Sequence, residues 1–455
     1  MSKEKVDLGK NSVGKLLLSL SVPAIIAQLV NVLYNIVDRV FIGRIPEVGE
    51  TAMAGVGVAF PIIIIISAFS GLIGGGGAPL VAIKMGEKNN DGAEKIVSNS
   101  FVTLIAIAIL LTVGFYIFKE PILWKFGASE ATIGYALEYL SIYLVGTIFV
   151  QIALGMNPFI NTQGFAKIGM KTVMIGAIIN IVLDPIFIFG FNMGVKGAAL
   201  ATILAQMVSA IWVLVFLFGK KSILKIRKKY LKPDFKIILS VMALGVAPFI
   251  MQATESLVLV SLNTQLLKYG GDLAISAMTI MSSIMQIVML PMLGLTQGGQ
   301  PIISYNYGAK QYDRVKKAFK LLLTVCLTYS VIMWAALMMF PEVFVSIFNK
   351  DPELIRITAS SIKIYFAGIF LFGAQIACQQ SFLALGQAKI SLFLALLRKI
   401  ILLVPLIFIL PMFMDNGLNA VLLAEPVADI LAALTTVTCF AIFYKNAFDK
   451  SNEIL

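Results

Sequence analysis

Long apolar runs alternate with short polar connections along the whole chain. A helix needs about 20 residues to cross the apolar core of a bilayer, and twelve runs are long enough. They lie near residues 16–43, 51–84, 93–118, 133–157, 168–190, 196–219, 237–267, 273–305, 318–340, 355–385, 390–413 and 418–444. The pattern predicts an all-α integral membrane protein with twelve transmembrane helices.

Composition supports this interpretation. Hydrophobic residues make up 59% of the 455 residues and charged residues 13%, with a mean hydropathy of +0.93, whereas soluble domains carry about 25% charged residues. The first apolar run is too long for a cleaved signal and lacks a small-residue cleavage site, so we expect it to remain as a span. The three cysteines all fall inside predicted spans, which argues against a disulfide framework or a cysteine metal site.

The positive charge is distributed unevenly between alternate connections. If both termini are cytoplasmic, the connections on that side hold most of the 36 basic residues, including eight in residues 220–236. This is the positive-inside asymmetry of membrane proteins. The net charge of +12 therefore predicts topology in a cell membrane and not binding to nucleic acid.

An internal repeat divides the chain. "GGGGAPLVAIKMGEKNNDGAEK" (74–95) aligns with "TQGGQPIISYNYGAKQYDRVKK" (296–317) at an offset of 222. The glycine runs at 74–77 and 298–299 predict close helix packing and bending in preference to phosphate binding. Each half holds six spans, an even number, so both enter the membrane in the same sense. We expect an N-terminal lobe at 1–219, a basic cytoplasmic linker at 220–236 and a C-terminal lobe at 237–455.

Polar side chains recur at helical spacing inside the spans of the first half. Gln28, Asn31, Asn35 and Asp38 lie on one face of the first span, with Tyr34 one turn before the acid. Asn180 and Asp184 are one turn apart, and Pro185 then removes a backbone donor. A mid-bilayer carboxylate costs roughly 3 kcal/mol. We therefore expect a group of side chains to bind a proton or Na⁺: Asp38, Asp184, Asn180, Thr202, Asn35 and Asn157.

The second half carries a different set of polar residues. Glu425 and Asp429 are one turn apart in the last span, Gln375 and Gln379 are one turn apart in the tenth, and the eleventh contains Arg398 and Lys399. A methionine stripe runs along the eighth span. The predicted substrate cavity comprises Gln28, Asn31, Tyr34, Gln252, Glu255, Met281, Met285, Gln375, Gln379, Arg398, Glu425 and Asp429.

Structural explanations compete with these assignments. Asn35 and Asn180 could serve only as interhelical hydrogen bonds, with Asp184 neutralised by a base, for which Arg39 is the one interior candidate in the first half. Glu425 or Asp429 could form a structural ion pair with Arg398. The methionine stripe could pack or face lipid, which is the more common role for such a stripe.

The segments "NIVLDPIFIFGFNMGVKGAALATILAQ" (180–206) and "LYNIVDRVFIGRI" (33–45) resemble the multidrug and toxic compound extrusion (MATE) family, in its MepA-like bacterial branch. The resemblance covers essentially the whole chain. It implies a V-shaped antiporter of two lobes that expels organic cations in exchange for H⁺ or Na⁺. By position, Asp38, Asn180, Asp184 and Thr202 match the family's N-terminal-lobe cation site, and Asn157 matches a further polar residue there. Glu255 falls where sodium-driven relatives carry an acid, but their second acid in span 10 is replaced by Gln375.

The functional hypothesis is therefore an antiporter for cationic drugs or metabolites that works by alternating access. A monomer is expected, in contact with membrane lipids and with no cofactor beyond the coupling ion. One rival is a lipid-linked precursor flippase, which needs several cavity bases to bind a pyrophosphate. A membrane-embedded enzyme is not expected, since the chain has no histidine and no aspartate motif for metal-dependent chemistry.

Overall fold

The computed structural model describes residues 6–449, and its first half consists of seven α-helices. A 59° bend divides one span into α4 and α5 at Gly146, where a side chain would collide with Ile203. After Pro185, the sixth helix continues as a π-helical turn, Ile186–Gly190. The bounds are α1 Val13–Gly43, α2 Gly49–Gly86, α3 Asn90–Lys125, α4 Ile133–Val145, α5 Thr147–Thr162, α6 Ala166–Pro185 and α7 Val195–Phe218.

The described part of the second half contains nine α-helices, several of which are segments of one span. Gly271 adopts a left-handed φ of 63° inside α9, a conformation open to glycine at little cost, and there the chain turns between two spans. A 51° bend separates α12 from α13. The bounds are α8 Phe235–Ala253, α9 Glu255–Gly308, α10 Tyr312–Met339, α11 Pro341–Ser346, α12 Pro352–Tyr365, α13 Phe372–Ala384, α14 Ala388–Leu396, α15 Val404–Ile409 and α16 Gly417–Tyr444.

These helices account for the twelve predicted spans. Within residues 6–449, nine helical stretches are long and apolar enough to cross a membrane, and two bent pairs add one span each. One of the nine, Phe235–Gly308, has 74 residues and supplies two spans, one before and one after Gly271. Large apolar side chains such as Leu110, Val215 and Leu434 are exposed, as expected for a surface in contact with lipid.

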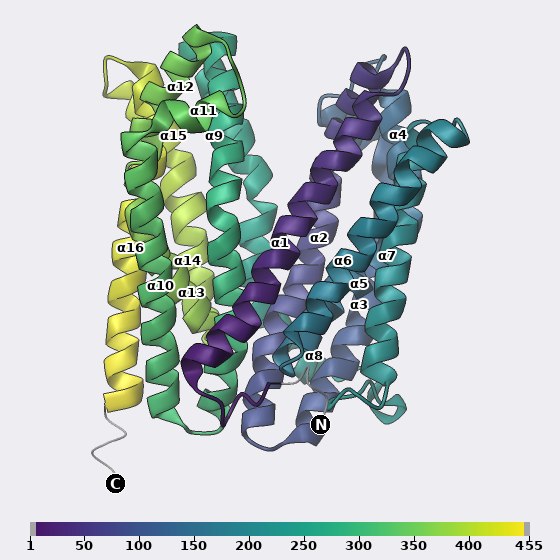
Figure 1. Ribbon diagram of the computed structural model, residues 1–455, viewed down its shortest axis with the longest axis vertical. Coiled ribbons are helices and arrows are strands. Elements are labelled where there is room, and N and C mark those ends of the chain that lie inside the picture. Colours follow the sequence, from purple (N-terminus) through teal and green to yellow (C-terminus); the bar gives the residue numbers. More distant parts are fainter. Residues whose placement is uncertain (1–5, 450–455) are drawn as a thin grey trace.

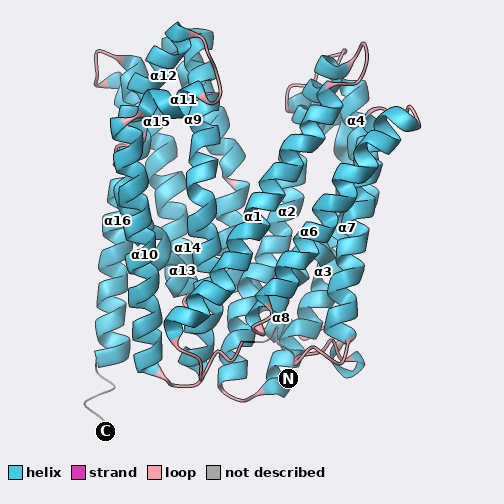
Figure 2. Ribbon diagram, viewed as in Figure 1, coloured by secondary structure: helices cyan, strands magenta, loops and turns pink. Residues whose placement is uncertain are grey.

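The helices form two bundles that converge at one end and diverge at the other, in a V shape (Figure 1). The described chain is helical apart from short connections (Figure 2). Helix α1 begins and α16 ends at the convergent end, as an even number of spans requires. Helix α1 runs obliquely from the base of the second bundle into the first, and its Leu16 and Leu20 pack with Ile302 of α9.

Repeat-related glycines allow the two halves to meet at the convergent end. A Cβ added at Gly86 would lie 2.0 Å from the carbonyl oxygen of Tyr305, and one at Gly308 would lie 2.0 Å from that of Ile83. Ile83 and Tyr305 are themselves 222 positions apart. The contact is therefore the same from both sides, as expected for pseudo-twofold symmetry. The close packing predicted for the glycine runs is seen at Gly76 and Gly298, where an added Cβ would lie 2.1 Å from the carbonyl oxygen of Val241 and 2.5 Å from the amide nitrogen of Ser21.

Two segments outside the α-helices connect the halves. Each segment contacts the half that its following helix does not belong to. Residues 6–12, the first strap, precede α1 but bind the second half, where Arg314 donates to the carbonyl oxygens of Leu8 at 3.0 Å and Asn11 at 2.7 Å. Residues 220–234, the second strap, precede α8 but bind the first half through α3. Glu94 there accepts hydrogen bonds from the Lys225 amide at 3.1 Å and from Arg227 Nε at 2.9 Å.

Candidate ion and substrate sites

The first candidate site is a buried polar group between α6 and α7. Asn180 and Asp184 are 1% and 0% exposed, and Thr202 approaches them from α7. The side-chain amide nitrogen of Asn180 lies 3.2 Å from Asp184 Oδ1 and 3.4 Å from Thr202 Oγ1. The i, i+4 spacing on α6 places the first two on one face, and the π-helical turn begins two residues after the acid, at Ile186.

Asp38 completes this group from α1. Its carboxyl group lies within hydrogen-bonding range of that of Asp184. Asp38 Oδ1, Asp184 Oδ2 and Asn180 Oδ1 are buried oxygen atoms without a hydrogen-bond partner among the described residues. Two ionised carboxylates at one apolar site repel each other, and unpartnered buried oxygens are costly. Oxygen atoms grouped in this way can accept a proton or a small hard cation such as Na⁺.

Two tyrosines lie beside the acids, and a third stacks on one of them. Tyr34 of α1 lies near both carboxyl groups and within hydrogen-bonding range of Asn35, while Tyr139 of α4 lies within hydrogen-bonding range of Thr202 and close to Asp38. Its ring stacks on that of Tyr143, with centroids 6.2 Å apart. Sequence reasoning missed Tyr139 and Tyr143, because two tyrosines one turn apart in an apolar span look like ordinary packing residues.

The alternative in which a base neutralises Asp184 finds no support. Within residues 6–449, the interactions of its side chain are with Asn180 and Asp38. The guanidinium of Arg39 instead lies 4.7 Å from the ring centroid of Phe60. Asn180 does join two helices, as the structural explanation required, but it also contacts the acid.

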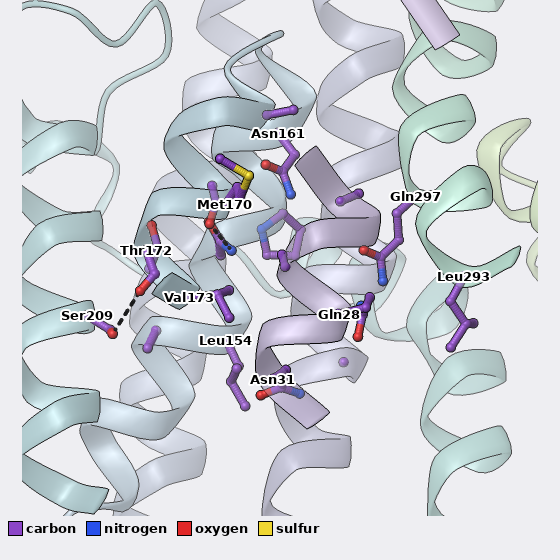
Figure 3. A pocket seen from close by; sticks show the side chains of 18 of the residues that line it. Gln28, Asn31, Leu154, Asn161, Met170, Thr172, Val173, Ser209, Leu293 and Gln297 are labelled. Atoms are coloured by element: carbon purple, nitrogen blue, oxygen red, sulfur yellow. Dashed lines mark hydrogen bonds between the residues drawn. The ribbon is translucent and has the colours of Figure 1, made fainter. Parts of the chain in front are cut away.

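An uncharged cavity of about 350 Å³ adjoins this group. No acidic or basic side chain among the described residues lines it, and amides line it from both halves of the chain. Figure 3 shows Gln28 of α1 and Gln297 of α9 on the side where the halves meet, with Asn31, Asn161 and Leu154 around the cavity. Its polar lining residues include Gln28, Asn31, Tyr34, Asn157, Asn161, Asn180, Thr202, Gln206, Gln297, Gln300 and Gln380.

Two predicted ion-site residues, Asn35 and Asn157, have hydrogen-bond partners outside the acid group. Asn35 donates to the carbonyl oxygen of Asn31, one turn earlier, at 2.7 Å. Asn157 lines the cavity and donates to the carbonyl oxygen of Gly169 at 3.2 Å. Gln297 and Gln300, which line the same cavity, were missed although "TQGGQP" displays them as polar residues within an apolar span.

In the second half, the predicted ion pair is present. Arg398 Nε lies 2.7 Å from Asp429 Oδ1, and Arg398 Nη2 lies 3.0 Å from Glu425 Oε1. Lys399 donates to Glu255 and, at 3.0 Å, to the carbonyl oxygen of Met251. These consecutive residues are both buried, and they lie in the π-helical stretch Leu397–Leu403 that continues α14. A flippase would need unpaired basic side chains in its cavity, whereas Arg398 and Lys399 are both paired with acidic side chains.

The remaining predicted cavity residues are scattered. Met281 is fully buried and Met285 packs at the edge of the core of the second half, so the structure places them as packing residues. Gln375 is buried on α13, and Gln379 donates to the carbonyl oxygen of Ser391 at 3.2 Å. Gln252 is exposed near Gly71 of α2. The structure therefore does not gather the twelve predicted cavity residues around one space.

Comparison with known proteins places these sites in context. The MatE family model matches residues 23–186 and 247–409, one segment in each half. The multidrug export protein MepA of Staphylococcus haemolyticus is 26% identical over 426 residues, which cover 93% of both chains. MepA of Staphylococcus aureus strain NCTC 8325 is 24% identical over 428 residues, or 94% of this chain and 93% of the relative.

Solved structures agree with this placement. The MATE multidrug transporter DinF-BH, solved in complex with a ligand, is 37% identical, with a TM-score of 0.89 and coverage of 98% of this chain and 99% of that one. An outward-facing MATE structure that is 22% identical has a TM-score of 0.90, with the same coverage, and shows the fold alone.

Proposed function

This chain belongs to the MatE family of multidrug efflux transporters, and on that premise we propose that it is a secondary antiporter in which Asp38 and Asp184 exchange the coupling ion for an organic cation. The transporter class, with drugs as substrates and several membrane passes, follows from the family. The coupling ion, its site and the direction of exchange are the proposed part.

One observation carries the proposal. Two buried carboxyl groups from different helices share one site, and three oxygen atoms of that site lack a partner among the described residues. A purely structural group would be expected to satisfy its buried oxygens. Thr202 and Asn180 orient the acids, and the same two residues line the neighbouring cavity, so that ion and substrate are close enough to influence each other.

The cavity favours a substrate with diffuse positive charge. Amide oxygens can accept hydrogen bonds from such a molecule, and Tyr34 offers an aromatic face. No cation of the protein competes inside the described lining. Once Asp38 and Asp184 have bound H⁺ or Na⁺, their attraction for an organic cation falls. Binding of one therefore weakens binding of the other, as antiport requires.

Alternating access is proposed from the V shape. The bundles diverge at one end and meet at the other through Gly86 and Gly308 (Figure 1). The end at which α1 begins and α16 ends also carries the basic second strap, and by the positive-inside rule we propose that it faces the cytoplasm of a bacterial cell. Exchange then needs the meeting end to open while the divergent end closes.

The test uses Asp184→Asn in reconstituted liposomes, with ethidium as the probe and either a pH gradient or a Na⁺ gradient imposed. Because asparagine binds neither H⁺ nor Na⁺ as a carboxylate does, gradient-driven ethidium transport should fall to background. The exposed Asp272→Asn serves as the matched control and should transport like the wild type. Wild-type transport under only one of the gradients identifies the ion, and undiminished transport by Asp184→Asn would refute the proposal.

A further inference from the structure

A charged cluster in the second half lies apart from the site described above. Arg398 and Lys399 extend from the π-helical stretch after α14, Glu425 and Asp429 lie on α16, and Glu255 begins α9. Arg398, Lys399, Glu425 and Asp429 are each less than 10% exposed. Tyr365 of α12 completes the surroundings as a buried phenol near the three acids.

The hydrogen bonds of this cluster are unequally shared. Asp429 Oδ1 accepts a hydrogen bond from Arg398 Nε at 2.7 Å. Glu425 accepts one from Arg398 Nη2 at 3.0 Å, through Oε1 alone. Glu425 Oε2 is buried without a partner among the described residues. Lys399 donates its hydrogen bonds to Glu255 and to the carbonyl oxygen of Met251. An ionised Glu425 would therefore leave half of its charge buried without a donor, which is costly.

The charges of the cluster do not balance. Three acids (Glu255, Glu425 and Asp429) against two bases (Arg398 and Lys399) leave one negative charge if all are ionised. Among the described residues, the charged and titratable groups that face Glu425 are these four and the phenol of Tyr365. One bound proton makes the cluster neutral. Glu425, whose Oε2 is the unpartnered oxygen, is the acid expected to bind that proton.

We propose that Glu425 binds a proton, forming a second carboxyl centre in the half of the molecule opposite to Asp38 and Asp184. The proton forms an O–H bond with the Glu425 carboxylate, and no other bond changes. Its source is water, which reaches the neighbouring Glu255, whose side chain is 66% exposed. Lys399 pairs with Glu255 and acts on Glu425 through its charge alone. The centre goes beyond the ion exchange proposed above and does not depend on which ion the first half carries.

The direct test is infrared spectroscopy of the purified protein, in which a protonated carboxyl group has a C=O stretching band separate from those of carboxylates. An Asp38→Asn/Asp184→Asn background removes the acids of the first half. In that background near neutral pH we expect the band to remain, to disappear on adding Glu425→Gln, and to survive the control Glu342→Gln, which changes an exposed glutamate. A background without the band, or a band that survives Glu425→Gln, would overturn the proposal.

Thermal stability of single variants provides a second test that does not require the triple variant to fold. Glutamine resembles a protonated glutamate, so Glu425→Gln should leave the Tm close to that of the wild type. Asp429→Asn removes an ionised partner from the buried guanidinium of Arg398 and should lower the Tm clearly. If Glu425→Gln lowers the Tm as much as Asp429→Asn does, Glu425 is an ionised member of a structural salt bridge and the proposal fails.

Discussion

Asn180 holds Asp184 against α7: one amide nitrogen reaches the carboxylate at 3.2 Å and Thr202 at 3.4 Å. Asn180→Ala should leave Asp184 without its donor and weaken transport without blocking membrane insertion. A lost hydrogen bond to a charged group costs about 1.5–3 kcal/mol, or roughly a 10- to 100-fold loss of rate. Ethidium transport in liposomes measures this, and the exposed Asn446→Ala is the control. Equal rates for both variants would show that Asn180 does not orient the acid.

Tyr139 offers a second way to disturb the acid group. Tyr139→Phe removes only the hydroxyl that faces Thr202 and Asp38, so it should slow transport while leaving Tm nearly unchanged. Tyr135→Phe, one turn earlier on α4, is the matched control. Transport rate and Tm should be measured together, because a loss of both would indicate a packing role for Tyr139.

The glycine contact between the halves should not accept a methyl group. Gly308→Ala would place a Cβ 2.0 Å from the carbonyl oxygen of Ile83, and the resulting strain should cost about 1–3 kcal/mol. We expect a lower Tm and slower transport. Gly114→Ala on α3 adds a methyl group where nothing lies within 4 Å and should be neutral. A Gly308→Ala protein as stable as the control would mean that the halves separate easily at this point.

Glu94 should hold the second strap in place. Glu94→Gln replaces a carboxylate that accepts from Lys225 and Arg227 with an amide that can accept through only one atom. We expect the strap to detach more often and trypsin to cleave it faster at its lysines and at Arg227. Glu87→Gln is the control, since Glu87 pairs only with Lys84 at the surface. Unchanged cleavage of the Glu94 variant would contradict this role.

The spans and the first candidate site were accessible from the sequence for physical reasons. Apolar runs long enough for a bilayer leave little choice of structure, and buried acids at helical spacing stand out because they are costly. Asp38, Asn180, Asp184 and Thr202 accordingly lie together. The repeat also revealed the two halves, and its glycine runs indicated close helix packing, since glycines that approach a neighbouring backbone cannot carry side chains.

Other features depended on contacts that spacing alone does not reveal. Tyr139 contacts the site because α4 packs on α7, far away in sequence. Arg398 and Lys399 are both buried within a π-helical stretch, and no residue pattern predicted that stretch. Met281 fills the core of the second half, and a methionine stripe looks alike whether it packs or binds a substrate. The two straps were also unforeseen, since polar connections seldom show where they attach.

The straps bear on how such a chain arises by duplication. At the repeat offset of 222, the first residue of α1 aligns with the first residue of α8, so the two straps occupy equivalent places. Two identical six-helix chains built this way would exchange their N-terminal arms across a twofold axis, as domain-swapped dimers do. Fusing the end of one chain to the arm of the next preserves both exchanges, with one arm becoming the linker. The connection between the halves thus needs no fold of its own, because it inherits a docking place that the ancestral partner already provided.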